Sequence, residues 1–346
     1  MSRATLVARL DNAGDVLLAG PAVRAAAGTG DPVHLLCGPR GREAARLLPG
    51  LAGVVVHRAP WIAPDPMAVR PEDSEALVDQ VRALGTWRAA ILGSSHQSPL
   101  PLALLLRWAG VAEIAAVSHE HAGSLLDHRI PGDPDVHEVE RGLLVTRALG
   151  LADPADDRLR VDIGLEGDPL PVGVEPGEDL VVVHPGASVP ARTMGPRQWR
   201  DAVRALSRTG RRIAVTGGGE EKRLTAFVSG DDRLVSDLGG RTTLRQLGRL
   251  LAGAGALVTG NTGPAHLAAA VGTPVVAVFP PTVPASRWRP WRVPHVVLGD
   301  QSVPCAGCRA RRCPLAEQVC VSGVSAGDVV SATDRLAGAR SPEATA

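Results

Sequence analysis

Asn261, Thr262, Gly263 and His266 gather where an apolar run meets a helical stretch, in "VTGNTGPAHLAAAVGTPVVAVF" (258–279). The glycine lets backbone approach a ligand closely. The N–H groups of the first helical turn and the positive end of the helix dipole favour an anion. Thr262 and His266 add donors, so this turn predicts a phosphate site. The alternative is an ordinary helix cap beside a packed histidine.

Two further loops have the same strand-to-helix setting. In "HPGASVPARTMGPRQW" (184–199), Arg192 could grip a diphosphate with its two-pronged guanidinium, although it could also be a solvated loop arginine. In "VTGGGEEKRL" (215–224), Glu220 or Glu221 could hold a ribose hydroxyl. Both acids would equally suit the first turn of a helix.

A carboxylate follows the first apolar run of the chain. Asp15 stands in "RLDNAGDVLLAGPAVRAA" (9–26), where a strand gives way to a helix. It could cap that helix. If it faces a ligand, it could instead serve as a general base, with the helix terminus favouring its ionised form.

Four cysteines lie close together near the end of the chain, spaced as C-x2-C-x4-C-x6-C: Cys305, Cys308, Cys313 and Cys320. This spacing predicts a structural zinc site, because four thiolates would leave no open catalytic position. Free thiols or disulfides are the alternatives. Cys37 stands apart and suits core packing.

Short β-branched runs alternate with longer helical stretches along the whole chain, which indicates parallel sheets covered by helices. Residues 151–178 are rich in Asp, Pro and Gly and interrupt the alternation. We therefore predict an α/β protein with two Rossmann-like domains facing a cleft, over 1–165 and 175–322. The first strand is followed by no GxGxxG and no Walker A loop, which disfavours dinucleotide oxidoreductases and P-loop enzymes.

The composition limits the classes of ligand and chemistry that the protein could use. A length of 346 residues suits two domains, and a formal charge of +1 without a long basic run disfavours nucleic acid. Lys222 is the only lysine, so Schiff-base chemistry has one candidate residue. No apolar run approaches the ~18 residues of a membrane span. We expect a cytoplasmic protein that has no transmembrane segment but could contact a membrane peripherally.

Taken together, these motifs resemble glycosyltransferase family 9, the ADP-heptose:lipopolysaccharide heptosyltransferases. The resemblance runs from about residue 4 to 336 in the family's order. It rests on the stretches already quoted, on "DLGGRTTL" (237–244) and on the cysteine-bearing tail.

The resemblance implies a GT-B fold with an acceptor-binding N-terminal domain and a nucleotide-sugar-binding C-terminal domain. It implies that a last helix, about 325–338, packs back on the first domain. It also implies inverting transfer that requires no metal or other cofactor.

The resemblance also assigns roles to residues of this sequence. Asp15 matches the catalytic aspartate. Arg192 and Ser188 match groups that bind the diphosphate, and Glu221 matches the acid near the nucleoside. Thr262, Gly263 and His266 match the diphosphate loop. Two residues depart from the family's pattern: Asn261 replaces its aspartate, and Arg192 replaces its usual lysine.

The function predicted from these features is transfer of a sugar, heptose by resemblance, from an ADP-sugar to an acceptor hydroxyl. The acceptor could be a glycan, a glycolipid or a natural product. One alternative is a GT-B-fold nucleotide-sugar epimerase or hydrolase, which would turn over the donor without an acceptor. The other is a non-catalytic nucleotide-sugar-binding protein, in which Asp15 is only a cap.

Overall fold

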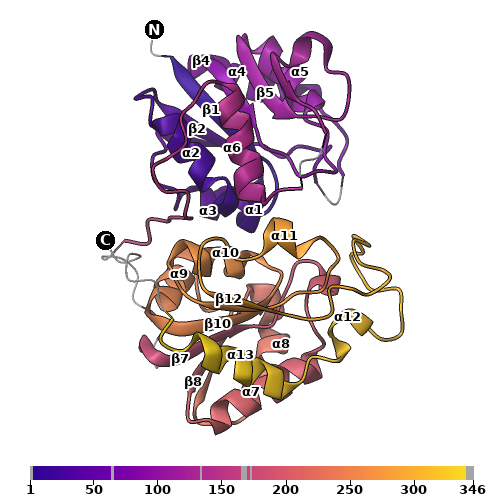
Figure 1. Ribbon diagram of the computed structural model, residues 1–346. Helices are drawn as coiled ribbons and strands as arrows, with labels where there is room; N and C mark the ends of the chain where they lie inside the picture. Colours follow the sequence, from indigo (N-terminus) through magenta and orange to yellow (C-terminus); the bar gives the residue numbers. More distant parts are fainter. Residues whose placement is uncertain (1–2, 64–65, 133–134, 165–169, 172–173, 340–346) are drawn as a thin grey trace. The chain divides into compact units, whose positions relative to one another are not determined.

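The computed structural model describes residues 3–63, 66–132, 135–164, 170–171 and 174–339. The chain forms two compact units, Met1–Asp162 and Ile163–Ala346 (Figure 1). The division lies within the Asp-, Pro- and Gly-rich stretch 151–178. Each unit is built on its own parallel sheet.

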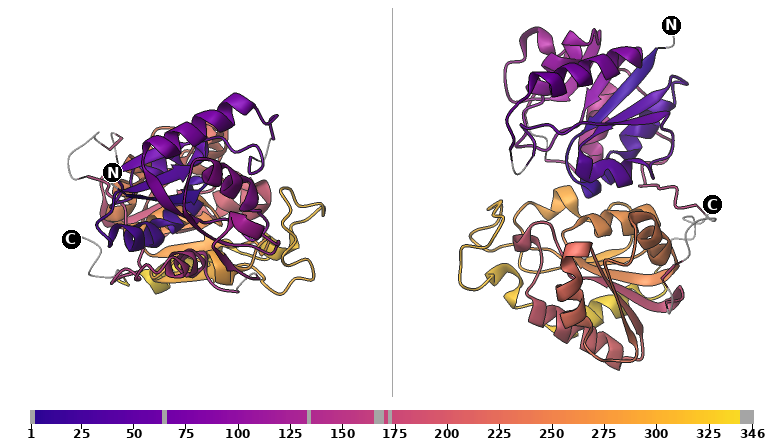
Figure 2. Two further views of the ribbon diagram at one scale, coloured as in Figure 1. Left: turned by 90° about the horizontal axis from the view of Figure 1, so that it is seen from above. Right: turned by 180° about the vertical axis from the view of Figure 1, so that it is seen from behind.

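The first unit is a six-stranded sheet with helices on both faces, in the strand order β3-β2-β1-β4-β5-β6 (Figure 2). Helices α4 and α5 pack together in a core on one face, and α2 and α6 contact each other on the other. The elements are β1 (Ala4–Arg9), α1 (Ala13–Leu18), α2 (Gly20–Ala27), β2 (Val33–Cys37), η1 (Pro39–Gly41), α3 (Arg42–Ala45), β3 (Gly53–Val56), α4 (Pro71–Ala83), β4 (Thr86–Ile91), α5 (Leu100–Trp108), β5 (Glu113–Val117), η2 (Gly123–Leu125), β6 (His128–Ile130) and α6 (Glu138–Ala148).

The second unit repeats this plan with a six-stranded sheet in the order β12-β11-β10-β7-β8-β9. Helices α7, α8 and α13 pack in the core on one face, and α9 and α10 pack against strands of the same sheet and against each other. The elements are β7 (Gly177–His184), η3 (Pro190–Arg192), α7 (Pro196–Arg208), β8 (Arg212–Gly217), η4 (Gly219–Glu221), α8 (Lys222–Ser229), β9 (Val235–Gly239), α9 (Leu244–Gly253), β10 (Ala254–Gly260), α10 (Gly263–Ala270), β11 (Val275–Val278), α11 (Ala285–Trp288), β12 (His295–Leu298), α12 (Val319–Ser322) and α13 (Ala326–Leu336).

Both sheets have the same connectivity. In each, the first strand of the unit lies in the interior beside its fourth strand, so β1 pairs with β4 and β7 pairs with β10. From the first strand of each sheet the next two strands are added toward one edge, and from the fourth strand the last two are added toward the other edge. In open parallel sheets, ligands bind beyond the carboxyl ends of the strands at such a switch point. The fold thus gives each unit one preferred binding edge.

The last helix belongs to the core of the second unit. Helix α13 packs there against α7. Val329, Ala332 and Leu336 are spaced at helical intervals and are buried there. This apolar stripe is covered within the second unit.

Trp199 is one of the largest fully buried side chains and belongs to the core of the second unit. Its side chain is 0% exposed, on the face of α7 that packs on the sheet. Replacing Trp199 by alanine should lower the free energy of unfolding by about 3–5 kcal/mol, because a large cavity replaces packed atoms. Urea unfolding followed by circular dichroism measures the change.

Trp108 is the matched control, since it is 59% exposed on α5. Trp108→Ala should change the stability by less than about 0.5 kcal/mol. Equal losses in the two variants would contradict the packing described for α7.

None of the helices in the described part of the chain combines the length and apolar character needed to cross a bilayer.

Candidate active site

Arg9 ends β1 at the binding edge of the first sheet. Leu6 and Ala8 point into the core beneath α4 and α5. Because side chains alternate along a strand, Arg9 points to the opposite face, where α6 lies. The side chain of Arg9 is only 4% exposed.

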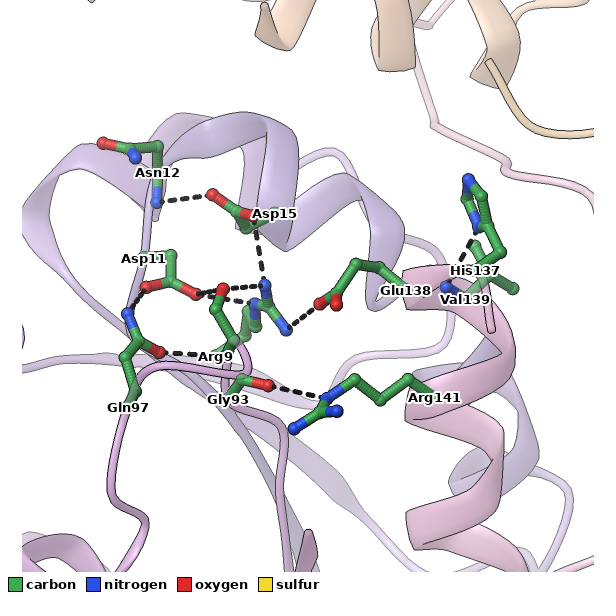
Figure 3. A network of polar contacts seen from close by, with 11 residues as sticks. Arg9, Asp11, Asn12, Asp15, Gly93, Gln97, His137, Glu138, Val139 and Arg141 are labelled. Atoms are coloured by element: carbon green, nitrogen blue, oxygen red, sulfur yellow. Dashed lines mark hydrogen bonds and ion pairs between the residues drawn. The ribbon is translucent and has the colours of Figure 1, made fainter. Parts of the chain in front are cut away.

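Asp15 lies directly above this arginine, as the third residue of α1 (Figure 3). Its Oδ1 accepts a hydrogen bond from Arg9 Nη2 at 3.0 Å, and its Oδ2 accepts one from the backbone N–H of Asn12 at 3.3 Å. Its side chain is 18% exposed. The carboxylate is therefore held on both oxygens yet still reachable from outside.

The guanidinium of Arg9 also contacts groups from two other segments. Nη1 donates to Glu138 Oε2 at 3.1 Å, and Nη2 donates to Ser94 Oγ at 3.0 Å. Nε lies 2.9 Å from Asp11 Oδ2. Gln97 donates to the other oxygen of Asp11. One arginine thus joins the loop after β1, the loop after β4 and the start of α6.

Burial and charge act against each other in this cluster. Burial raises the pKa of Asp11 and of Glu138, while the charge of Arg9 opposes both shifts. Burial alone would lower the pKa of Arg9, but Asp11, Glu138 and Asp15 raise it far above its ordinary value. Arg9 is therefore a permanent cation shared by carboxylates.

A cavity of about 120 Å³ opens beside the same edge of the first unit. Asp11 and Asn12 line one side of it, and Arg40 and Arg58 line another. Both arginines are exposed. The cavity therefore offers positive charge close to the loop that leads into Asp15.

In the second unit, the loops after β7 and β10 touch each other at the binding edge. The backbone N–H of Asn261 donates to the carbonyl of Arg192 at 3.1 Å. A Cβ on Gly260 would lie 2.6 Å from that carbonyl oxygen, so only glycine fits there. The segment that ends with Arg192 is thereby fixed against the start of α10.

The turn at 261–266 has the predicted placement. Thr262 is the N-cap of α10, Gly263 is its first residue, and His266 is buried in its first turn. Thr262 Oγ1 lies 3.1 Å from Thr259 Oγ1. Asn261 is only 6% exposed, and its side-chain Nδ2 finds no hydrogen-bond partner among the described residues. A buried amide donor without a partner suits a ligand oxygen.

Glu221 closes η4 and occupies a niche lined by glycine. A Cβ on Gly186 would lie 1.9 Å from Glu221 Oε1, and the backbone N–H of Gly218 donates to Oε2 at 2.7 Å. Glu220 is exposed and outside this niche. Of the two neighbouring acids, Glu221 is the one that the loops after β7 and β8 enclose.

His184, at the end of β7, lies beneath this niche. Its Nδ1 is 3.0 Å from Thr216 Oγ1, and its Nε2 is 3.8 Å from Glu221 Oε2. Burial lowers the pKa of His184, although the charge of Glu221 acts in the opposite direction. The neutral imidazole therefore packs under Glu221 at neutral pH.

The remaining predicted residues of the β7 loop differ in burial. Ser188 is exposed, and Arg192 is half-buried at the end of η3. Ser188 thus lies on the same loop as Arg192, four residues before it.

The zinc prediction is not supported. Cys305 and Cys308 are exposed thiols, and Cys313 and Cys320 are partly buried thiols. Within the described residues, no three His, Cys, Asp or Glu side chains form a group that could hold a metal ion. Burial raises the pKa of the Cys320 thiol, and Cys305 and Cys313 raise it further. Spacing along an irregular loop does not fix the directions of its side chains.

Sequence reasoning missed the partners of the predicted residues. In the first unit these partners are Arg9, which contacts Asp15, and the residues around Arg9 and Asp11, namely Ser94, Gln97 and Glu138. In the second unit the partner is His184, which lies under Glu221. Only a weak signal was available, namely a charged residue at the end of an apolar run, as with Arg9 and His184. Glu138 is 129 residues from Arg9, so no local pattern could connect them.

A solved structure establishes the fold. The ADP-heptose lps heptosyltransferase II of Escherichia coli matches with a TM-score of 0.71, covering 96% of this chain and 98% of that chain at 16% identity. At this identity the likeness establishes the fold. The chain has the GT-B fold of two-domain glycosyltransferases, which confirms the predicted fold class.

The family follows from the sequence. The sequence model of glycosyltransferase family 9 (heptosyltransferase) matches residues 96–318, more than half of the chain, so the protein belongs to this family. Lipopolysaccharide heptosyltransferase 1 of Pseudomonas aeruginosa is 26% identical over 82% of this chain and 84% of its own length. Lipopolysaccharide heptosyltransferase 3 of Escherichia coli is 28% identical over 46% of this chain, and the match spans only 47% of that relative. The family resemblance seen in the motifs is thus confirmed.

Proposed function

We propose that the protein is an inverting glycosyltransferase that moves heptose from ADP-heptose to an acceptor hydroxyl, with Asp15 as the general base. The observation that carries this proposal is the carboxylate of Asp15, held on both oxygens at the switch point yet 18% exposed. The choice of donor is supported by the structural relative named for ADP-heptose.

In the proposed reaction, Asp15 accepts the proton of the acceptor hydroxyl while that oxygen attacks the anomeric carbon. The bond between the sugar and the diphosphate breaks, and its electron pair leaves with ADP. The sugar passes through an oxocarbenium-like state, as in glycoside hydrolysis. Attack on the face opposite the leaving group inverts the configuration.

The leaving diphosphate gains negative charge, and the second unit supplies groups to stabilise it. Arg192 contributes a cation, and the first turn of α10 contributes its dipole and the side chain of Thr262. Asn261 and His266 sit in the same turn, and Ser188 on the loop after β7. This set supplies the stabilising charge from the protein itself, so the proposed transfer needs no metal.

The donor's ribose is assigned to Glu221. Its carboxylate is fixed over Gly186 and by the N–H of Gly218, while its side chain remains 25% exposed. A carboxylate so placed can accept hydrogen bonds from sugar hydroxyls.

The acceptor is assigned to the first unit. The cavity beside Asp11 and Asn12 carries Arg40 and Arg58, which favour an acceptor bearing a carboxylate or phosphate. An anionic glycan or glycolipid meets this requirement, and a glycolipid would bring the protein to a membrane surface.

Calorimetric titration with ADP, UDP and GDP tests the donor site. The unmodified protein should bind ADP more tightly than UDP or GDP. Arg192→Ala should weaken ADP binding about 10- to 100-fold, since a hydrogen bond to a charged group is worth about 1.5–3 kcal/mol. Arg197→Ala, at an exposed arginine in the first turn of α7, should leave the affinity unchanged.

Absence of ADP binding by the unmodified protein would overturn the proposed donor. ADP affinity that is equal in Arg192→Ala and Arg197→Ala would remove Arg192 from the site.

A further inference from the structure

The proposed reaction assigns a role to Asp15 but none to Arg9, the buried arginine that contacts it. Arg9 lies beneath Asp15, and its side chain is 4% exposed. It reaches Asp15 and Ser94 with Nη2 and Glu138 with Nη1, each at 3.0–3.1 Å (Figure 3). Three segments far apart in the sequence thus meet at one guanidinium.

The charges of this cluster do not balance. Arg9 is one cation among three carboxylates, those of Asp11, Asp15 and Glu138. Such a buried cluster is weak evidence for stability, because removing charges from water costs about as much as their attraction returns. A role in holding the reactive group accounts for it better.

We propose that Arg9 is a positioning residue, which fixes the orientation of Asp15 and keeps it ionised to receive the acceptor's proton. This inference rests on the proposed role of Asp15 as the base. The planar guanidinium presents donors in a rigid fork, so it can hold Asp15 on one branch while Glu138 anchors the other. The proton that Asp15 accepts then leaves to solvent from its exposed side.

Several charged groups face Asp15 and its support. Arg9 and Asp11 come from the end of β1 and the loop after it, and His96 comes from the loop after β4. Glu138 and Arg141 come from α6. The guanidinium of Arg9 contacts Asp15 directly at 3.0 Å, so removing this charge should change the titration of Asp15 strongly.

The neighbouring strand β4 offers a matched control, Arg88, which contacts the start of β1. Arg88 is also buried, and its Nε donates to Thr5 Oγ1 at 2.9 Å while its Nη2 lies 3.5 Å from Asp31 Oδ2. Thr5 is near the start of β1, whereas Arg9 ends it. Arg88 is therefore a buried arginine of the same sheet, remote from the binding edge.

The experiment is a carbon-13 NMR titration of full-length protein labelled at aspartate side-chain carboxyls. The signal of Asp15 is identified by its loss in Asp15→Asn. In Arg9→Met, loss of the neighbouring cation disfavours ionised Asp15, so the titration midpoint should rise by about one pH unit or more. Arg9→Lys keeps the positive charge, so its titration midpoint should lie close to that of the unmodified protein. Arg88→Met should leave the midpoint unchanged.

A midpoint that stays the same in Arg9→Met would overturn the proposal, as would an equal shift in Arg88→Met. If Arg9→Met does not fold, the neutral variant Arg9→Gln takes its place, and a midpoint that stays the same in Arg9→Gln would overturn the proposal. The titration requires no substrate. Failure of the proposed function would instead appear as absent ADP binding, so the two failures are distinguishable.

Discussion

Replacing Asp15 by asparagine should lower kcat by about 1,000-fold while the affinity for ADP changes less than about twofold. General-base catalysis typically contributes about 10²–10⁴ in rate, and asparagine keeps the shape of the side chain but cannot accept the proton. The bonds to Arg9 and to the N–H of Asn12 use carboxylate oxygens that asparagine retains in part. Initial rates of ADP release from ADP-heptose, with an anionic glycan or glycolipid acceptor found by screening, measure kcat.

Asp31→Asn provides the control, because Asp31 pairs with Arg88 near the start of β1 in the same unit. It should retain nearly full activity. Equal rates in Asp15→Asn and the unmodified protein would exclude Asp15 as the base. A large loss of ADP affinity in Asp15→Asn would show that its effect arises through the fold or the donor site.

Replacing Gly260 by alanine should weaken ADP binding about tenfold or more. The added Cβ would lie 2.6 Å from the carbonyl oxygen of Arg192, and backbone atoms cannot yield as a flexible side chain can. The loops after β7 and β10 must then separate, which moves Arg192 away from the start of α10. Losing one charge-assisted contact accounts for a change of this size, and overpacking adds a loss in stability of about 1–3 kcal/mol. Calorimetry with ADP and urea unfolding measure the two effects.

Gly323→Ala is the steric control, since a Cβ there meets nothing within 4 Å. It should affect neither measurement. Unaltered ADP binding in Gly260→Ala would mean that the contact between the two loops does not matter for the donor.

The sheets could be predicted because their strands are continuous apolar runs. Runs such as "DLVVVH" and "RRIAVTG" are too short for helices and are followed within two residues by glycine, which marks parallel strands with buried faces. The strand-to-helix loops then placed Asp15, Thr262 and Glu221 at the carboxyl ends of strands, as the structure shows.

The partners of these residues could not be predicted, because they depend on which helix covers which face. Arg9 meets Glu138 because α6 covers the face of the sheet opposite α4 and α5. The partner of α13 within the second unit could not be predicted for a related reason, since its apolar stripe fits any apolar surface and the sequence does not say which. The cysteine spacing alone could not predict how the thiols are arranged, because the loop that carries Cys305 to Cys313 has no regular structure to orient them.

The fluorescence of Trp199 should report on the loop after β7, which carries Arg192. The chain has no tyrosine, so its near-ultraviolet emission arises from six tryptophans. The indole N–H of Trp199 donates to Thr193 Oγ1 at 2.9 Å, and that hydroxyl donates to the carbonyl of Pro185 at 2.8 Å. Thr193 directly follows Arg192, so one hydrogen bond separates a fully enclosed fluorophore from the loop assigned to the diphosphate. A ligand that shifts this loop changes the surroundings of the indole, which makes the protein its own fluorescent reporter.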